Sequence, residues 1–203
     1  MGKLNLLKGA YEGKVGQTVG AKWKNKSTVR TFTKPSDPKT QAQMDVRNAF
    51  AAMTSFVALF ADQIKYISPL STAGMSVRNA IIKQNKAQIQ GNAFDAANLV
   101  IAKGGLQKPS TVAVAKEETT NVLKATFAKP TATNFTKKAI AVLVAVDKTN
   151  QIVDVATGPA SEGSVTGTIA FVGTDKIDTY LYFLDYRGTA KVGSLSVYTA
   201  VGA

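Results

Sequence analysis

The chain has 203 residues, with 25 Lys and Arg against 13 Asp and Glu, and a formal net charge of +12. Hydrophobic residues make up 45% and charged residues 19%, which is typical of a folded chain with one large or two small domains. Because His and Cys are absent, zinc fingers, imidazole or thiol catalysis, disulfides and haem or iron–sulfur ligation are excluded. We therefore expect a protein that is not an enzyme and that uses no cofactor and no small-molecule substrate.

The sequence shows no signal for export or membrane insertion. Its first residues include Lys3 and Lys8 but lack the apolar run of a signal peptide. The most apolar stretch, residues 48–61, has 14 residues, whereas a helix needs about 20 to cross a bilayer. These observations predict a soluble protein without a membrane partner.

The positive charge is concentrated at one end of the chain. Residues 1–39 contain nine basic and two acidic residues, a net charge of +7. Residues 91–203 are nearly balanced, with a net charge of +2. The electrostatic field of the molecule should therefore be dominated by its N-terminal region.

Residues 14–33 are predicted to form two short strands, because Val, Thr, Trp and Phe are frequent and glycines interrupt the first strand. A three-residue loop at 25–27 separates the side chains into an apolar face and a basic face. A two-residue loop would mix them, so the three-residue loop is favoured. The predicted apolar face carries Val19, Ala21, Trp23, Val29 and Thr31, and the predicted basic face carries Lys22, Lys24 and Arg30.

The basic residues of this predicted β-hairpin are the candidate functional residues. Phosphate contacts supply affinity for nucleic acid, and an aromatic side chain can stack on a base. The predicted register buries Trp23, however, so that only the charge would remain for such a role. We interpret Trp23, Gly16 and Gly20 as structural anchors. The candidate contacts to a partner or to nucleic acid are Lys22, Lys24, Lys26 and Arg30.

Two helices are predicted after a linker that contains prolines. Thr40 and Gln43 fit a capping box, and apolar residues then recur at three- and four-residue steps to about residue 67. So wide an apolar surface predicts a helix that is covered on most sides. A second helix, from about residue 72 to 89, would form an antiparallel pair with the first.

One internal similarity lies within these helices. The segment that begins at Met44 recurs 31 residues later at Met75, and each copy contains an Arg-Asn pair. Similar packing requirements are the simpler explanation. The alternative is that Arg47 and Arg78 occupy equivalent places and bind one partner or brace one linker. We interpret both arginines as structural anchors.

Beyond residue 106 the sequence changes to short alternating runs separated by turn residues. The run around Val144 is apolar at successive positions, which predicts a central strand buried on both sides. The whole pattern predicts an α+β fold: a basic hairpin and helical-pair domain (1–92), then an immunoglobulin- or fibronectin-like β-sandwich (93–203). Candidate strands cover residues 98–103, 111–116, 122–128, 138–147, 152–157, 164–172, 179–186 and 194–201.

Three further patterns do not meet the requirements of a nucleotide-binding, paired-carboxylate or calcium-binding site. The glycines at 13, 16 and 20 form neither a dinucleotide fingerprint nor a P-loop, since no strand precedes them and no helix follows. Glu117 and Glu118 are adjacent and would point to opposite sides of a strand. Asp175 and Asp178 are too few for a calcium loop. No catalytic, cofactor or metal site is therefore assigned.

Short motifs along nearly the whole chain are similar to those of a known protein family. The chain thereby resembles an uncharacterised family of proteins of about 200 residues, found mainly in bacteroidete and phage genomes. The resemblance implies a helical middle, a β-rich C-terminal half and an association with phages, but no activity. The motifs are Gly13-Lys14-Val15-Gly16, Val19-Gly20, Trp23-Lys24, Val29-Arg30, Thr40-x-Ala42-Gln43 with Arg47 and Phe50, Tyr180-Leu181-x-Phe183, and Ser196-Val197-Tyr198.

Together, these features favour a structural or assembly protein located in a virion or in the cytoplasm. It would act as a homo-oligomer or within a larger protein assembly, docking through the N-terminal hairpin and helices. The alternative is a basic nucleic-acid-binding protein that uses the same hairpin.

Overall fold

The computed structural model describes residues 3–5, 10–23, 26–34, 36–70, 74–90, 94–117, 122–168 and 176–202. Contacts divide the chain into two compact units, Met1–Thr40 and Gln41–Ala203. We call the first the N-terminal sheet and the second the body. Residues 32–40 link the last strand of the sheet to the first helix of the body.

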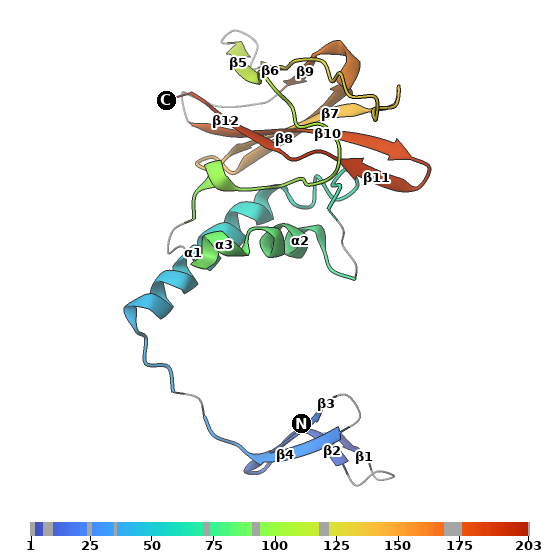
Figure 1. Cartoon of the computed structure of the whole chain (residues 1–203). Coiled ribbons are helices and arrows are strands. Elements are labelled where there is room, and N and C mark those ends of the chain that lie inside the picture. The colour runs from blue at the N-terminus through green and yellow to red at the C-terminus, as the bar shows by residue number, and fades with distance from the viewer. Residues whose placement is uncertain are drawn as a thin grey trace. The chain divides into compact units, whose positions relative to one another are not determined.

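The N-terminal sheet is an antiparallel meander of four strands in the order β1-β2-β3-β4 (Figure 1). The expectation of a two-stranded hairpin is therefore corrected, because two further strands precede β3. Gly16 makes the tight connection between β2 and β3 possible, since its φ of 58° is left-handed. The strands are β1 (Lys3–Asn5), β2 (Ala10–Val15), β3 (Thr18–Trp23) and β4 (Lys26–Thr31).

The body consists of helices followed by two antiparallel sheets, which confirms the α+β class. Two short 3₁₀ helices, η1 (Ala96–Asn98) and η2 (Ala160–Glu162), lie between its main elements. The helices are α1 (Gln41–Phe60), α2 (Val77–Gln84) and α3 (Lys86–Gln90), and the strands are β5 (Ala113–Glu117), β6 (Val122–Thr126), β7 (Ile140–Asp147), β8 (Ile152–Pro159), β9 (Ser164–Thr168), β10 (Ile177–Arg187), β11 (Ala190–Gly193) and β12 (Val197–Val201).

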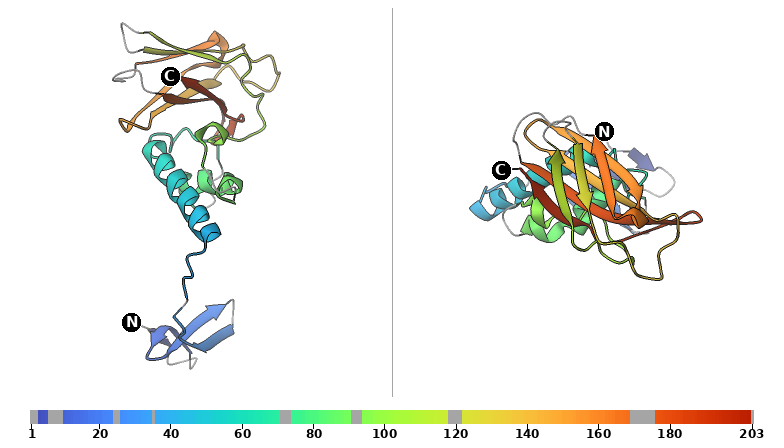
Figure 2. Two further views of the ribbon diagram at one scale, coloured as in Figure 1. Left: turned by 90° about the vertical axis from the view of Figure 1, so that its left-hand side faces the viewer. Right: turned by 90° about the horizontal axis from the view of Figure 1, so that it is seen from above.

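The body has three layers, which the views of Figure 2 show from two sides. A three-stranded sheet, β5-β6-β9, packs on one face of a five-stranded sheet, and the helices cover the other face of that larger sheet. In the larger sheet β10 pairs with β7 on one edge and with both β11 and β12 on the other. The eleven residues of β10 therefore form the centre of the body.

Alternation along β10 divides the core in two. Tyr180 and Tyr182 face the helices, where they pack in one cluster with Phe56 and other residues of α1. Leu181 and Phe183 face the three-stranded sheet and pack in a second cluster. Strand β7 is buried along the same two faces, which confirms the prediction of a central strand around residue 144.

The second predicted helix is in fact two short ones, because the chain breaks at Asn85. This residue is buried, and its side-chain amide donates to the carbonyl oxygens of Ile81 and Val100, at 2.8 Å each. Its Oδ1 accepts from the N–H of Val100, also at 2.8 Å. The break thus joins the helices to the segment that leads into the sandwich.

Two further expectations differ from the structure. Residues 98–103, expected to be a strand, begin at the end of η1 and continue without a strand; there the N–H of Ile101 donates to Ser196 Oγ at 3.1 Å. The expected boundary between residues 92 and 93 does not coincide with the division between the two units. The helices share a core with β7 and β10, and the sheet that separates from them is the N-terminal one.

A close backbone approach generates the first prediction. A Cβ added to Gly104 would lie 2.1 Å from the carbonyl oxygen of Gly193, whereas a Cβ on neighbouring Gly105 meets nothing within 4 Å. Gly104→Ala should lower the free energy of unfolding by about 1–3 kcal/mol, and Gly105→Ala should change it by less than about 0.5 kcal/mol. Urea denaturation measures both, and equal stabilities of the two variants would contradict the close approach.

The buried tyrosines generate the second prediction. Burial raises the pKa of Tyr180 and of Tyr182 well above the ordinary value, and their hydroxyls donate to the carbonyl oxygens of Ala96 (2.7 Å) and Ile67 (3.2 Å). The unfolded chain, with tyrosine pKa values of about 10, loses these protons first. The free energy of unfolding should therefore fall as the pH rises through about 10 and be insensitive to these groups below about pH 9.

Denaturation at several pH values measures this dependence. Tyr182→Phe keeps the ring but has no proton to lose, so its alkaline decline should be shallower than that of the wild type. An unchanged slope would show that Tyr182 does not contribute.

Candidate interaction surfaces

The register of the N-terminal sheet corrects the predicted faces of the hairpin. Trp23 pairs with Lys26 and Lys22 with Ser27, so two residues rather than three separate the paired strands, and Lys26 and Ser27 belong to β4 instead of the expected loop at 25–27. Directly opposite residues share a face, which places Lys22 on one face of the sheet and Arg30 on the other. The expected basic face carrying both is therefore wrong.

A different group of cations gathers on one face. Lys26 and Arg30 lie on the same face of β4, and Arg30 is opposite Val19 of β3. Lys14 of β2 is also opposite Val19 and so shares this face. We call Lys14, Lys26 and Arg30 the basic face. Lys14 was not among the candidates predicted from the sequence. Its signal was its place directly before Val15, because neighbouring residues of a strand point to opposite faces.

Phe32 adds an aromatic ring to this arrangement. Its N–H donates to the carbonyl oxygen of Gln17 at 2.7 Å, which continues the pairing of β4 beyond Thr31. The ammonium group of Lys14 lies 3.8 Å from the centre of the Phe32 ring, a cation–π contact. One face of this ring is therefore already occupied.

The residues of the N-terminal sheet whose burial is described form almost no core. All six residues of β4 are exposed, and Val29 and Val15 are 59% and 51% exposed. Among the residues of this unit whose burial is described, only Gly20 is buried; it lies between Gly13 of β2 and Val29 of β4. These described residues therefore contribute little buried apolar surface to the stability of the sheet.

The remaining predicted residues of the hairpin are placed as follows. Gly16 lies at the turn between β2 and β3, and Gly20 lies between Gly13 and Val29 of the neighbouring strands; that they anchor the hairpin stays a prediction. Trp23 ends β3, but its side chain lies outside the described part, as does the whole of Lys24. Whether Trp23 anchors the hairpin stays a prediction.

The first turns of α1 are a second exposed surface. Met44, Val46 and Phe50 are exposed, which corrects the expectation of a helix covered on most sides. Val46 and Phe50 are four residues apart, so they lie on one side of the helix, the side that Met53 and Val57 bury one to two turns later. Arg47 lies on the same exposed turns.

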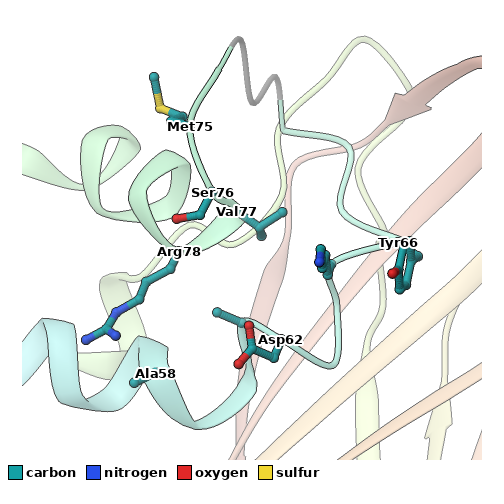
Figure 3. Close-up of a pocket in the computed structure, with 9 residues that line it drawn as sticks. Ala58, Asp62, Tyr66, Met75, Ser76, Val77 and Arg78 are labelled. Atoms are coloured by element: carbon teal, nitrogen blue, oxygen red, sulfur yellow. The ribbon is translucent and has the colours of Figure 1, made fainter.

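A shallow pocket lies between the end of α1 and the start of α2, as Figure 3 shows. Its volume is about 410 Å³, and its lining includes Asp62, Lys65, Tyr66 and Arg78. The guanidinium of Arg78 donates to the carbonyl oxygen of Thr54 at 3.2 Å and so ties α2 to α1. Arg78 lies in the first turn of its helix and Arg47 in the second turn of α1, so the two are not at equivalent places.

A second groove of about 520 Å³ is lined by lysines from separate segments. Lys83 lies in the last turn of α2, Lys86 begins α3, and Lys103 follows the segment that contains Val100, the partner of Asn85. No acidic residue is found in its described lining, so an anion would be attracted to it.

The described part of the chain shows no group of three or more His, Cys, Asp or Glu side chains that could hold a metal ion. Within the same residues, no helix combines the length and hydropathy needed to cross a membrane.

The fold and these surfaces define a helix-covered antiparallel sandwich preceded by a small basic sheet. A model of a family of unknown function, DUF6266, matches residues 10–199, and the chain belongs to this family. No curated protein matches the chain.

The missing core of the N-terminal sheet generates the third prediction. In dilute solution the backbone amides of β3 and β4 should exchange with deuterium much faster than those of β7 and β10, because local opening of the sheet exposes little apolar surface. Hydrogen exchange followed by mass spectrometry of peptides from both regions measures this. Equal protection would show that the sheet is stabilised by burial that its described residues do not account for.

Proposed function

We propose that this chain is a non-enzymatic structural or assembly protein. It docks through roughly its first fifty residues onto like copies or onto a larger protein particle. The particle we propose is a phage virion or surface assembly, which is supported by the family resemblance of its motifs. The body acts as the displayed or building part.

The observation that carries this proposal is where exposed apolar side chains lie. Large hydrophobic side chains that are exposed in the described part of the chain fall mainly within residues 15–50, whereas the body buries most of its own in two clusters. Exposed apolar side chains that lie together, as Val46 and Phe50 do on one side of α1, are typical of interaction sites. The members within residues 15–50 are Val15, Val29, Phe32, Met44, Val46 and Phe50.

We also propose that the sandwich is immunoglobulin- or fibronectin-like. The order of its strands supports this assignment: β5-β6-β9 form one sheet, and β8-β7-β10 with β11 and β12 form the other. If β11 and β12 are two halves of one last strand, this is the A-B-E and C′-C-F-G arrangement of that class. Such sandwiches serve widely as surface and assembly modules, so the assignment agrees with the proposed role.

The second candidate is binding to nucleic acid. The lysine groove favours it, because phosphate contacts need cations and its described lining has no carboxylate. The basic face adds three cations, although Glu12 of β2 lies on the same face as Lys14. A salt titration of oligonucleotide binding tests this candidate. If the chain does not bind an oligonucleotide even at low salt, the candidate is eliminated.

Light scattering over a range of concentrations tests the assembly proposal. The wild type should show masses above the 21.4 kDa of one chain. Replacing both Val46 and Phe50 by Ser should weaken association by roughly tenfold or more, since two apolar side chains lose their partner surface.

The matched control is Tyr66→Ser, which removes an exposed aromatic residue of the body, 74% accessible and outside the docking region. It should leave association unchanged. A strict monomer at every concentration, with no protein partner captured by the wild type, would contradict the proposal.

A further inference from the structure

Strand β4 forms an open edge of the N-terminal sheet. Among the described strands it pairs only with β3. The N–H of Phe32 points toward β3, where it donates to Gln17. Because alternate residues of a strand direct their N–H and C=O groups to the same side, Ser27, Val29 and Thr31 direct theirs away from β3. The outer edge therefore presents unpaired donors and acceptors at these three residues.

The side chains along this edge form a regular pattern. Lys26 and Arg30 lie four residues apart on the basic face, with the hydroxyl residue Thr28 between them. The other face of β4 carries Ser27, Val29 and Thr31, which are uncharged and exposed. An added strand would meet two cations on one face and small or β-branched side chains on the other.

This pattern selects one kind of partner. A strand with carboxylates four residues apart would place both opposite the two cations, while its main chain pairs with the edge of β4. Nucleic acid can use the charge but not the row of main-chain groups. In addition, Phe32 near this face is already covered on one side by Lys14.

We propose that the outer edge of β4 binds an extended acidic segment of a partner protein, which adds to the N-terminal sheet as a further strand. This inference rests on the proposed docking function and names the chemistry of the partner. The added strand would also cover side chains of β4, all of which are exposed in the chain alone.

Lysine and arginine on an edge strand can have the opposite purpose, which is to deter any pairing. The two roles differ in their response to charge. A deterrent edge rejects all strands, whereas a receptor edge binds acidic strands and rejects basic ones.

The experiment uses the full chain and a labelled peptide, Thr-Glu-Val-Thr-Val-Glu-Thr, with fluorescence anisotropy at low and physiological salt. The control peptides have Lys in place of both Glu, or N-methyl groups at the amides that would face β4. We expect the acidic peptide to bind in a salt-dependent manner, and both control peptides to bind at least roughly tenfold more weakly, as lost ion pairs and hydrogen bonds require.

Two variants at one position isolate the main-chain contribution. Val29→Pro removes an N–H that points outward and leaves the pairing with β3 intact, which an edge strand tolerates. Val29→Thr keeps the backbone N–H and replaces the side chain by one of similar size. We expect Val29→Pro to weaken binding roughly tenfold and Val29→Thr to change it less than about twofold.

Strand addition would be overturned if the two variants bound the acidic peptide equally, or if the N-methylated peptide bound as tightly as the unmethylated one. The comparison of the two peptides remains decisive even if Val29→Pro fails to fold. The inference would also be overturned if the chain bound an oligothymidine but not the acidic peptide. If the peptide fails while the chain still associates through Val46 and Phe50, only this inference falls; loss of both would remove the docking function as well.

Discussion

The body depends on one strand that is covered on both faces. Successive residues of β10 enter different cores: Tyr182 packs with the helices, and Phe183 packs with the three-stranded sheet. The polar ends of its tyrosines are satisfied by carbonyl oxygens of distant segments, which ties the helices and η1 to the sheet. The helices therefore cannot separate from the sandwich without exposing β10.

The N-terminal sheet is built on the opposite principle. Its neighbouring strands pair with each other, but Val15, Val29 and the described cations of β2, β3 and β4 remain exposed. These exposed residues therefore add little burial to its stability, and hydrogen bonds contribute little net free energy without burial. A charged sheet with an open edge at β4 and exposed valines is suited to association, because any surface that covers these residues adds burial.

The sequence predicted the body better than the N-terminal sheet, and the reason is periodicity. Consecutive apolar residues in β7 and alternation around Tyr182 reported burial directly. The hairpin register depended on whether its loop includes Lys26, and a shift of one residue in loop length reverses the faces. The break at Asn85 is set by its pairing with Val100, a contact that no local pattern reveals.

The link between the two units, residues 32–40, sets a limit on distance. Nine residues span at most roughly 30 Å when fully extended. If the N-terminal sheet is held on a surface, the body is confined within that radius, at an effective concentration in the millimolar range for a short tether. Neighbouring bodies on such a surface would then meet often, so that even weak contacts between sandwiches would be sufficient to order them into a layer.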